Sequence, residues 1–164
     1  QQDWKLLLVP HEVSDKHIQQ LAARLPLPHL RYSKLSADSD LAGARVLILD
    51  TVGLLACAYA YGELAYVGGG FGSGLHNTLE PTAHALPVFF GPKYHRFPEA
   101  VHFVKAGGGF VVKDAQDFQQ QFRRLSRNEA AYQQAVAVLR NYFAQARGAT
   151  QRIMAGMERS LSSK

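Results

Sequence analysis

The sequence contains the stretch Tyr66-Val67-Gly68-Gly69-Gly70-Phe71-Gly72-Ser73-Gly74-Leu75-His76-Asn77-Thr78-Leu79-Glu80-Pro81, in which five of the seven residues from 68 to 74 are glycine. The apolar residues before the glycines predict a β-strand, and the residues after them predict a helix. Glycine lets the backbone approach a ligand closely, and the start of a helix offers N–H groups and a positive dipole end to an anion. We therefore interpret residues Gly68–Gly74, the glycine loop, as a phosphate-binding loop.

The glycine loop differs from two common nucleotide-binding patterns. Leu75 follows Gly74 where G-x-x-x-x-G-K-[ST] requires lysine, and it also occupies the place of the third glycine of G-x-G-x-x-G. The first predicted strand is followed by Pro10-His11-Glu12, which contains no glycine. A dinucleotide-binding Rossmann domain is therefore not expected.

Glu80 admits two interpretations. Asn77 and Glu80 have the spacing of a capping box, with Asn77 at the N-cap and Glu80 at N3. Pro81 would then be N4, whose N–H makes the first intrahelical bond, and proline has no N–H. If Pro81 is instead the first helical residue, the Glu80 carboxylate faces the ligand cleft at the carboxyl ends of the strands. It can then accept hydrogen bonds from the vicinal hydroxyls of a ribose. We favour the ligand role.

Short apolar runs elsewhere in the chain predict further strands, and helical spacing predicts helices between them. Strands that are almost wholly apolar and alternate with helices indicate an α/β fold, with a Rossmann-like parallel sheet covered by helices on both faces. The predicted strands are Trp4–Val9, His29–Ser33, Val46–Asp50, Leu64–Val67, Pro87–Phe90 and Gly109–Val112. The predicted helices begin at Ser14, cover Leu54–Tyr61, Thr78–Ala85 and Phe97–Ala106, and continue after Asp114, from about Asn128 and around Ile153–Leu161.

Length and composition indicate one soluble globular domain. The chain has 164 residues, of which 47% are hydrophobic and 19% charged, so we expect a single domain, 1–164, that ends in a helical tail, 113–164. The chain starts at Gln1 without an initiator Met, as a segment of a longer protein would. No apolar stretch is long enough to span a membrane. Cys57 is the only cysteine, which excludes a disulfide scaffold, and its apolar surroundings predict burial.

Positive charge is concentrated in the last third of the chain. The 18 Lys and Arg exceed the 13 Asp and Glu by five, and the whole excess lies in 113–164. Solvated helix faces or an anionic partner both fit this distribution. No nucleic-acid-binding motif accompanies it, and the histidines and single cysteine form no zinc pattern, so we expect neither nucleic acid nor a metal.

Two further loops carry residues that suit a ligand. Lys93 and Arg96 follow a predicted strand, where their charge suits an anion or belongs to a solvated turn. Asp50-Thr51-Val52-Gly53 follows another strand, where Asp50 or Thr51 is equally suited to cap the next helix.

The glycine loop and its flanking segments resemble the 3-deoxy-D-manno-octulosonic acid (Kdo) transferases, in particular their C-terminal half. Leu54 and Arg96 depart from the family, because many members have Glu and Asn at these positions. The resemblance extends from Trp4 to Leu125. The residues that carry it are Val9–Val13, Arg31–Ser33, Asp50–Gly53, Ala65–Phe71, Gly74–Pro81, Leu86–Tyr94 and Phe97–Ala100.

The resemblance implies that the chain is one half of a GT-B glycosyltransferase, in which two Rossmann-like domains face each other across a cleft. The C-terminal half would bind the donor CMP-Kdo. The absent N-terminal half would bind a lipid A precursor and supply the membrane anchor and the acidic general base. The full-length protein would act in lipopolysaccharide biosynthesis at the cytoplasmic face of the bacterial inner membrane, as an inverting and metal-independent enzyme without a cofactor. This segment would be soluble and inactive alone.

The same resemblance assigns the donor site. Glu80 is expected on the ribose, and the glycine loop and helix start near the phosphate. No catalytic residue is expected in this segment. The basic C-terminal helices are a candidate surface for anionic lipid. The expected donor-binding residues are Gly68, Gly69, Gly70, Phe71, His76, Asn77 and Glu80, followed by His11, Ser33, Asp50, Gly53, Lys93 and Glu99.

Two alternatives remain open from the sequence. A GT-B domain could use another nucleotide sugar, such as a UDP-sugar, or the chain could be a non-catalytic nucleotide-binding module.

Overall fold

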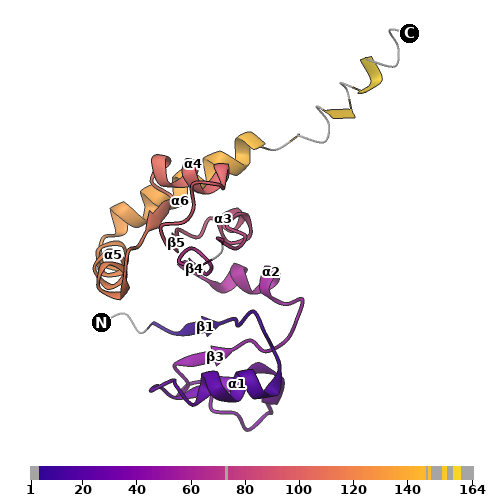
Figure 1. Cartoon of the computed structure of the whole chain (residues 1–164), viewed down its shortest axis with the longest axis vertical. Helices are drawn as coiled ribbons and strands as arrows, with labels where there is room; N and C mark the ends of the chain where they lie inside the picture. The colour runs from indigo at the N-terminus through magenta and orange to yellow at the C-terminus, as the bar shows by residue number, and fades with distance from the viewer. Residues whose placement is uncertain (1–3, 73, 147, 149–152, 155–156, 160–164) are drawn as a thin grey trace. The chain divides into compact units, whose positions relative to one another are not determined.

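A computed structural model describes residues 4–72, 74–146, 148, 153–154 and 157–159 (Figure 1). The contacts divide the chain into two compact units, Gln1–Ala58 and Tyr59–Lys164. Each unit contains a three-stranded parallel sheet, and each is described by itself. The single domain expected over the whole chain stays a prediction.

The sheet of the first unit has β3 at its centre. Leu47 of β3 pairs with Leu7 of β1 and with Leu30 of β2, and both pairings are parallel. Helix α1 packs Ile18 against Val46 and Ile48, and all three side chains are buried. The elements of this unit are β1 (Leu6–Leu8), α1 (Asp15–Ala22), β2 (His29–Arg31), the 3-10 helix η1 (Tyr32–Lys34), β3 (Val46–Ile48) and α2 (Leu55–Ala58).

The sheet of the second unit has β5 at its centre, in the order β4-β5-β6. All six strands that the sequence predicts are present in the two sheets, and the α/β fold is confirmed. The elements of the second unit are η2 (Tyr59–Tyr61), β4 (Ala65–Val67), α3 (Leu79–Ala83), β5 (Val88–Phe90), α4 (Pro98–Ala106), β6 (Gly109–Val111), α5 (Ala115–Arg127) and α6 (Glu129–Ala146).

Helices cover both faces of the second sheet. Successive residues of a strand point to opposite faces, so Val88 and Phe90 of β5 belong to one apolar cluster and Phe89 to another. The first cluster includes Ala100 of α4, and the second includes Leu125 of α5. β5 is completely buried as a result, with relative exposures of 0–1%.

Three helix ends follow the sequence closely. Helix α4 begins with Pro98 and ends before Gly107, which has a φ of 90° in the left-handed region. Asp114 Oδ1 accepts a hydrogen bond from the N–H of Asp117 at 2.8 Å and so caps α5. Asn128 Oδ1 accepts one from the N–H of Ala131 at 3.0 Å, at the start of α6.

Two expectations near α2 are wrong. Cys57 is exposed, because α2 is only four residues long and buries none of its side chains. Asp50 and Thr51 do not cap this helix, because it begins at Leu55.

The expected last helix is only partly within the described residues. Ile153, Met154 and 157–159 are helical, whereas Leu161 lies outside the described residues. Over the residues that the structure describes, the helices are too short or too polar to cross a membrane.

Candidate functional site

The glycine loop begins where β4 ends, and backbone hydrogen bonds close it on itself. The N–H of Gly72 donates to Gly69 O at 2.9 Å, and the N–H of His76 donates to Gly68 O at 3.1 Å. Gly69 has a φ of 86°, and a Cβ atom there would collide with Gly74 O. Glycine is therefore required at this position. Ser73, within the loop, lies outside the described residues.

The loop that follows β5 holds the glycine loop from the neighbouring strand. A Cβ atom on Gly70 would lie 2.6 Å from Gly91 N, so the two backbones are in direct contact. Lys93 donates its backbone N–H to Gly70 O at 2.9 Å and its ammonium group to Gly72 O at 3.0 Å. A Cβ atom on Gly91 would lie 2.7 Å from Phe71 Cδ2. The structure therefore brings the predicted residues Gly70, Phe71 and Lys93 together.

Glu80 lies at a helix position that neither interpretation of the sequence gave. Thr78 is the N-cap of α3, so Glu80 is N2 and Pro81 is N3. The N–H of an N3 residue has no partner within the helix, so proline loses no intrahelical hydrogen bond there. The capping box and the assignment of Pro81 as first helical residue are both wrong.

Asn77 fixes the Glu80 carboxylate. Its Oδ1 accepts a hydrogen bond from the N–H of Leu79 at 2.9 Å, and its Nδ2 donates to Glu80 Oε1 at 2.8 Å. Both side chains lie on the surface. The arrangement presents an oriented carboxylate to solvent at the start of α3.

Two neighbours complete the surroundings of the glycine loop and of Glu80. The His76 ring lies beside the glycine loop, since a Cβ atom on Gly68 would be 3.7 Å from its Nδ1. Burial raises the pKa of Tyr59, and the nearby negative charge of Glu80 raises it further. Sequence reasoning missed Tyr59, because nothing in the predicted helix Leu54–Tyr61 distinguishes it from a core aromatic residue.

Glu99, another predicted residue, is half-buried in the first turn of α4. Its negative charge there interacts favourably with the positive end of the helix dipole. The residue before this helix, Phe97, reaches the end of the glycine loop, because its Cζ would lie 3.9 Å from a Cβ atom on Gly74. The start of α4 therefore adjoins the glycine loop.

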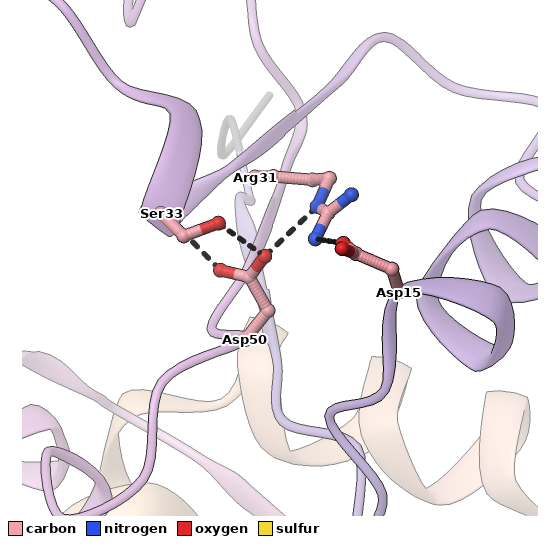
Figure 2. A network of polar contacts seen from close by, with 4 residues as sticks. All are labelled: Asp15, Arg31, Ser33 and Asp50. Atoms are coloured by element: carbon pink, nitrogen blue, oxygen red, sulfur yellow. Dashed lines mark hydrogen bonds and ion pairs between the residues drawn. The ribbon is translucent and has the colours of Figure 1, made fainter.

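A polar network occupies the ends of β2 and β3 in the first unit (Figure 2). Asp50 Oδ1 accepts the backbone N–H of Ser33 at 2.8 Å, and its Oδ2 accepts the Ser33 hydroxyl at 2.6 Å and Arg31 Nε at 2.8 Å. Arg31 Nη2 donates to Asp15 Oδ1 at 2.7 Å. Both oxygens of Asp50 are therefore engaged within the protein.

The charge of Asp50 is strongly stabilised. Burial raises its pKa, but the hydrogen bonds from the hydroxyl and N–H of Ser33 and from Arg31 outweigh burial, and the pKa falls to about 2. The Arg31 guanidinium, in turn, holds the pKa of Asp15 below its ordinary value. The sequence analysis expected Asp50 to bind the donor. In this structure Asp50 holds the backbone of Ser33, directly after β2.

The remaining predicted residues lie in loops of the first unit. His11 follows β1 and is exposed. Gly53 has a φ of 90°, a conformation that favours glycine, and a Cβ atom there would have nothing within 4 Å. The structure thus joins Ser33 with Asp50 in one unit, and the glycine loop with Lys93, and Asn77 with Glu80, in the other.

No group of three or more His, Cys, Asp or Glu side chains in the described part of the chain is placed to hold a metal ion. The expectation that the reaction needs neither metal nor cofactor stays a prediction.

The comparisons with known proteins point to one family. No protein-family model matches the chain. It is 35% identical to the 3-deoxy-D-manno-octulosonic acid transferase of Aquifex aeolicus over 113 residues, which are 67% of this chain and 30% of that protein. The corresponding enzyme of Bordetella pertussis is 30% identical over 157 residues, or 93% of this chain and 36% of that protein. The chain thus spans about a third of the length of these curated relatives.

A solved structure has the same fold. The crystal structure of the C-terminal CMP-Kdo binding domain of WaaA from Acinetobacter baumannii matches with a TM-score of 0.72 and 21% identity, over 85% of this chain and 89% of that one. The α/β fold of parallel strands and helices is therefore shared with that domain. The glycine loop and the segments around it, the sequence relatives and the fold agree, and the chain belongs to the 3-deoxy-D-manno-octulosonic acid transferase family.

Proposed function

We propose that the chain is the donor-binding part of an inverting glycosyltransferase that moves Kdo from CMP-Kdo to a lipid A precursor. The observation that carries the proposal is the orientation of the Glu80 carboxylate, whose Oε1 accepts a hydrogen bond from Asn77 Nδ2 at 2.8 Å. The glycine loop belongs to the same unit of the chain. The name of the structural neighbour, a CMP-Kdo binding domain, supports the identity of the donor.

In this proposal Glu80 binds the ribose of the donor. The amide of Asn77 donates to Oε1, which turns the carboxylate outward at N2 of α3. A carboxylate accepts hydrogen bonds from two vicinal hydroxyls, and such charge-assisted bonds are stronger than neutral ones. Because CMP and UMP share the ribose, Glu80 supplies affinity but does not distinguish the two nucleotides.

The glycine loop takes the phosphate. Its glycines allow close approach of the backbone, and the exposed ammonium of Lys93, 3.0 Å from Gly72 O, adds positive charge beside it. Charge that develops on the departing CMP is stabilised there without a bound metal. The acceptor hydroxyl needs a general base, which we assign to a domain outside this chain, so the chain alone is expected to give no turnover.

The proposal also includes contact between a basic face of α5 and the membrane that holds the acceptor. Arg123, Arg124 and Arg127 lie exposed along α5, where the apolar residues Phe122 and Leu125 face the core. Each basic residue near an anionic membrane surface contributes about 1 kcal/mol of attraction. We place this face against the cytoplasmic leaflet of the inner membrane. Binding to phosphatidylglycerol vesicles at low salt, but not to phosphatidylcholine vesicles, is the expected result.

Calorimetric titration with CMP tests the donor site. CMP is expected to bind, and Glu80→Ala is expected to weaken binding at least tenfold, because a hydrogen bond to a charged group contributes about 1.5–3 kcal/mol. Glu63→Ala is the matched control, since Glu63 is also an exposed carboxylate of the second unit.

UMP and AMP complete the experiment. UMP that binds as tightly as CMP would favour a UDP-sugar as the donor. Binding of no nucleotide at all would contradict a donor site formed by this chain alone. Equal effects of Glu80→Ala and Glu63→Ala on CMP binding would show that Glu80 is not part of the donor site.

A further inference from the structure

We propose that Lys93 is a positioning residue that holds the glycine loop in its ligand-binding shape, with the strand-end loop of β5 as the template. The proposal rests on the proposed function, because it assigns a role in a site for an anionic nucleotide. It differs from a direct phosphate contact in one respect. A positioning residue acts on the empty loop, whereas a ligand acts only when the phosphate is present.

Lys93 binds the glycine loop at two points. Its backbone N–H donates to Gly70 O at 2.9 Å, and its ammonium group donates to Gly72 O at 3.0 Å. The two acceptors are alternate carbonyl groups on either side of Phe71. A single residue therefore spans the middle of the loop and restrains the peptide units on both sides of Phe71.

The strand that precedes Lys93, β5, is the most deeply buried strand of the second unit. Lys93 stands three residues after Phe90, and the three residues of β5 have relative exposures of 0%, 1% and 0%. Gly91 lies between Phe90 and Lys93, and its backbone contacts Gly70 so closely that a Cβ atom on Gly70 would be 2.6 Å from Gly91 N. The loop after β5 thus carries a fixed surface to which Gly70 and Gly72 are attached.

The loop needs such support because of its composition. Glycine loses more conformational freedom on ordering than any other residue, so a loop with glycines at 68, 69, 70 and 72 pays a high entropy cost to bind a ligand unless it is ordered beforehand. Within Gly68–Gly72 one backbone hydrogen bond, from the N–H of Gly72 to Gly69 O at 2.9 Å, contributes to that order. Lys93 adds two more bonds from outside the segment. Preorganisation of this kind raises affinity by lowering the cost of binding.

Amide hydrogen exchange of the 164-residue chain, measured by NMR without ligand, tests the proposal. The probes are the N–H groups of Gly72 and Lys93, which donate to Gly69 O and Gly70 O. Lys93→Met is expected to speed their exchange about fivefold, as loss of one net hydrogen bond would. Lys93→Arg keeps a donor and is expected to restore slow exchange. Lys105→Met, at an exposed lysine of α4, is the matched control and should exchange like the wild type.

Titration of the same variants with CMP gives the second readout. Faster loop exchange together with CMP binding about fivefold weaker in Lys93→Met, both restored by Lys93→Arg, would support the positioning role. Unchanged exchange with weaker CMP binding would overturn it in favour of a direct phosphate ligand. Faster exchange with unchanged CMP binding would also overturn it. If wild-type chain binds no CMP, the proposed function has failed, and the exchange rates alone decide whether Lys93 holds the loop.

Discussion

Arg31 donates its Nε hydrogen to Oδ2 of Asp50 at 2.8 Å, and the Asp50 side chain is only 1% exposed. The same guanidinium binds Asp15, at the start of α1, through Nη2. Arginine suits this place because its planar group offers several donors in fixed directions. A buried carboxylate with a permanent cationic partner gives the first unit a measurable dependence on pH.

Acid is expected to destabilise the first unit through Asp50. The pKa of Asp50 is about 2 in the folded chain and 3.8 for an unperturbed carboxyl. A lowered pKa stabilises the fold while the group is ionised, so the contribution is complete above pH 3.8 and is lost as pH falls towards 2. Its size is about 2 kcal/mol. Urea unfolding, followed by the fluorescence of Trp4, the only tryptophan, measures it.

Two variants separate Asp50 from the other carboxylates. Asp50→Asn is expected to lower the free energy of unfolding by about 2 kcal/mol at neutral pH and to flatten its decrease in acid. Asp38→Asn, at an exposed carboxylate of the same unit, is the control and should follow the wild-type curve. Parallel pH curves for the two variants would contradict a special role for Asp50.

Thr78 and Thr82 form a matched pair with opposite expectations. Thr78 Oγ1 is buried without a hydrogen-bond partner among the described residues, because the N3 residue that an N-cap threonine would bind is Pro81, which has no N–H. Thr82 Oγ1 donates to Thr78 O at 2.7 Å.

Valine at these two positions should therefore act differently. Thr78→Val is expected to leave the stability unchanged or to raise it, since it removes a buried polar atom that has no partner. Thr82→Val is expected to lower the free energy of unfolding by about 1 kcal/mol. Denaturant unfolding followed by circular dichroism measures both. A loss for Thr78→Val as large as that for Thr82→Val would show that the Thr78 hydroxyl has a partner.

Alanine at two glycines of the same loop tests the contact between the loops. Gly70→Ala places a Cβ atom 2.6 Å from Gly91 N and is expected to cost about 2 kcal/mol or more. Gly72→Ala places one 3.7 Å from Gly69 O, an ordinary contact, and is expected to change stability by less than about 0.5 kcal/mol. Thermal unfolding compares the two variants. Equal melting temperatures would mean that the loops are further apart than the structure places them.

Cys57 is expected to react in the native state. It is exposed on a four-residue helix, so dithionitrobenzoate should label one thiol per chain without denaturant. The denatured chain gives the reference rate. Labelling that appears only after denaturation would show that Cys57 is covered.

The elements of this fold could be predicted because local patterns determine them. The apolar runs at β3 and β5 form strands whose successive side chains point to opposite faces of the sheet. Asp114 marks the start of α5 through its side-chain hydrogen bond, and Gly107 marks the end of α4 through its left-handed backbone conformation. The predicted burial of Cys57 is wrong for a related reason. An apolar run predicts burial only where a neighbouring element covers it, and α2 buries none of its residues.

The geometry of the site depended on contacts that the sequence does not encode locally. Glu80 was recognised as important, yet its helix position follows from Thr78 as the N-cap. The ammonium of Lys93 binds Gly72, which lies 21 residues earlier, and Asp50 binds Ser33, which lies 17 residues earlier. Residue type and position after a strand predicted that these groups lie near a ligand site, but not which partner each one has.

The contact between Gly70 and Gly91 also restricts how this protein can change. When two large core residues meet, a gain of volume at one is commonly offset by a loss at the other. No residue is smaller than glycine, so neither position can make room for a side chain on the other. Substitution at either site has no compensating partner at the other, and a variant with a side chain at either position must move the two loops apart.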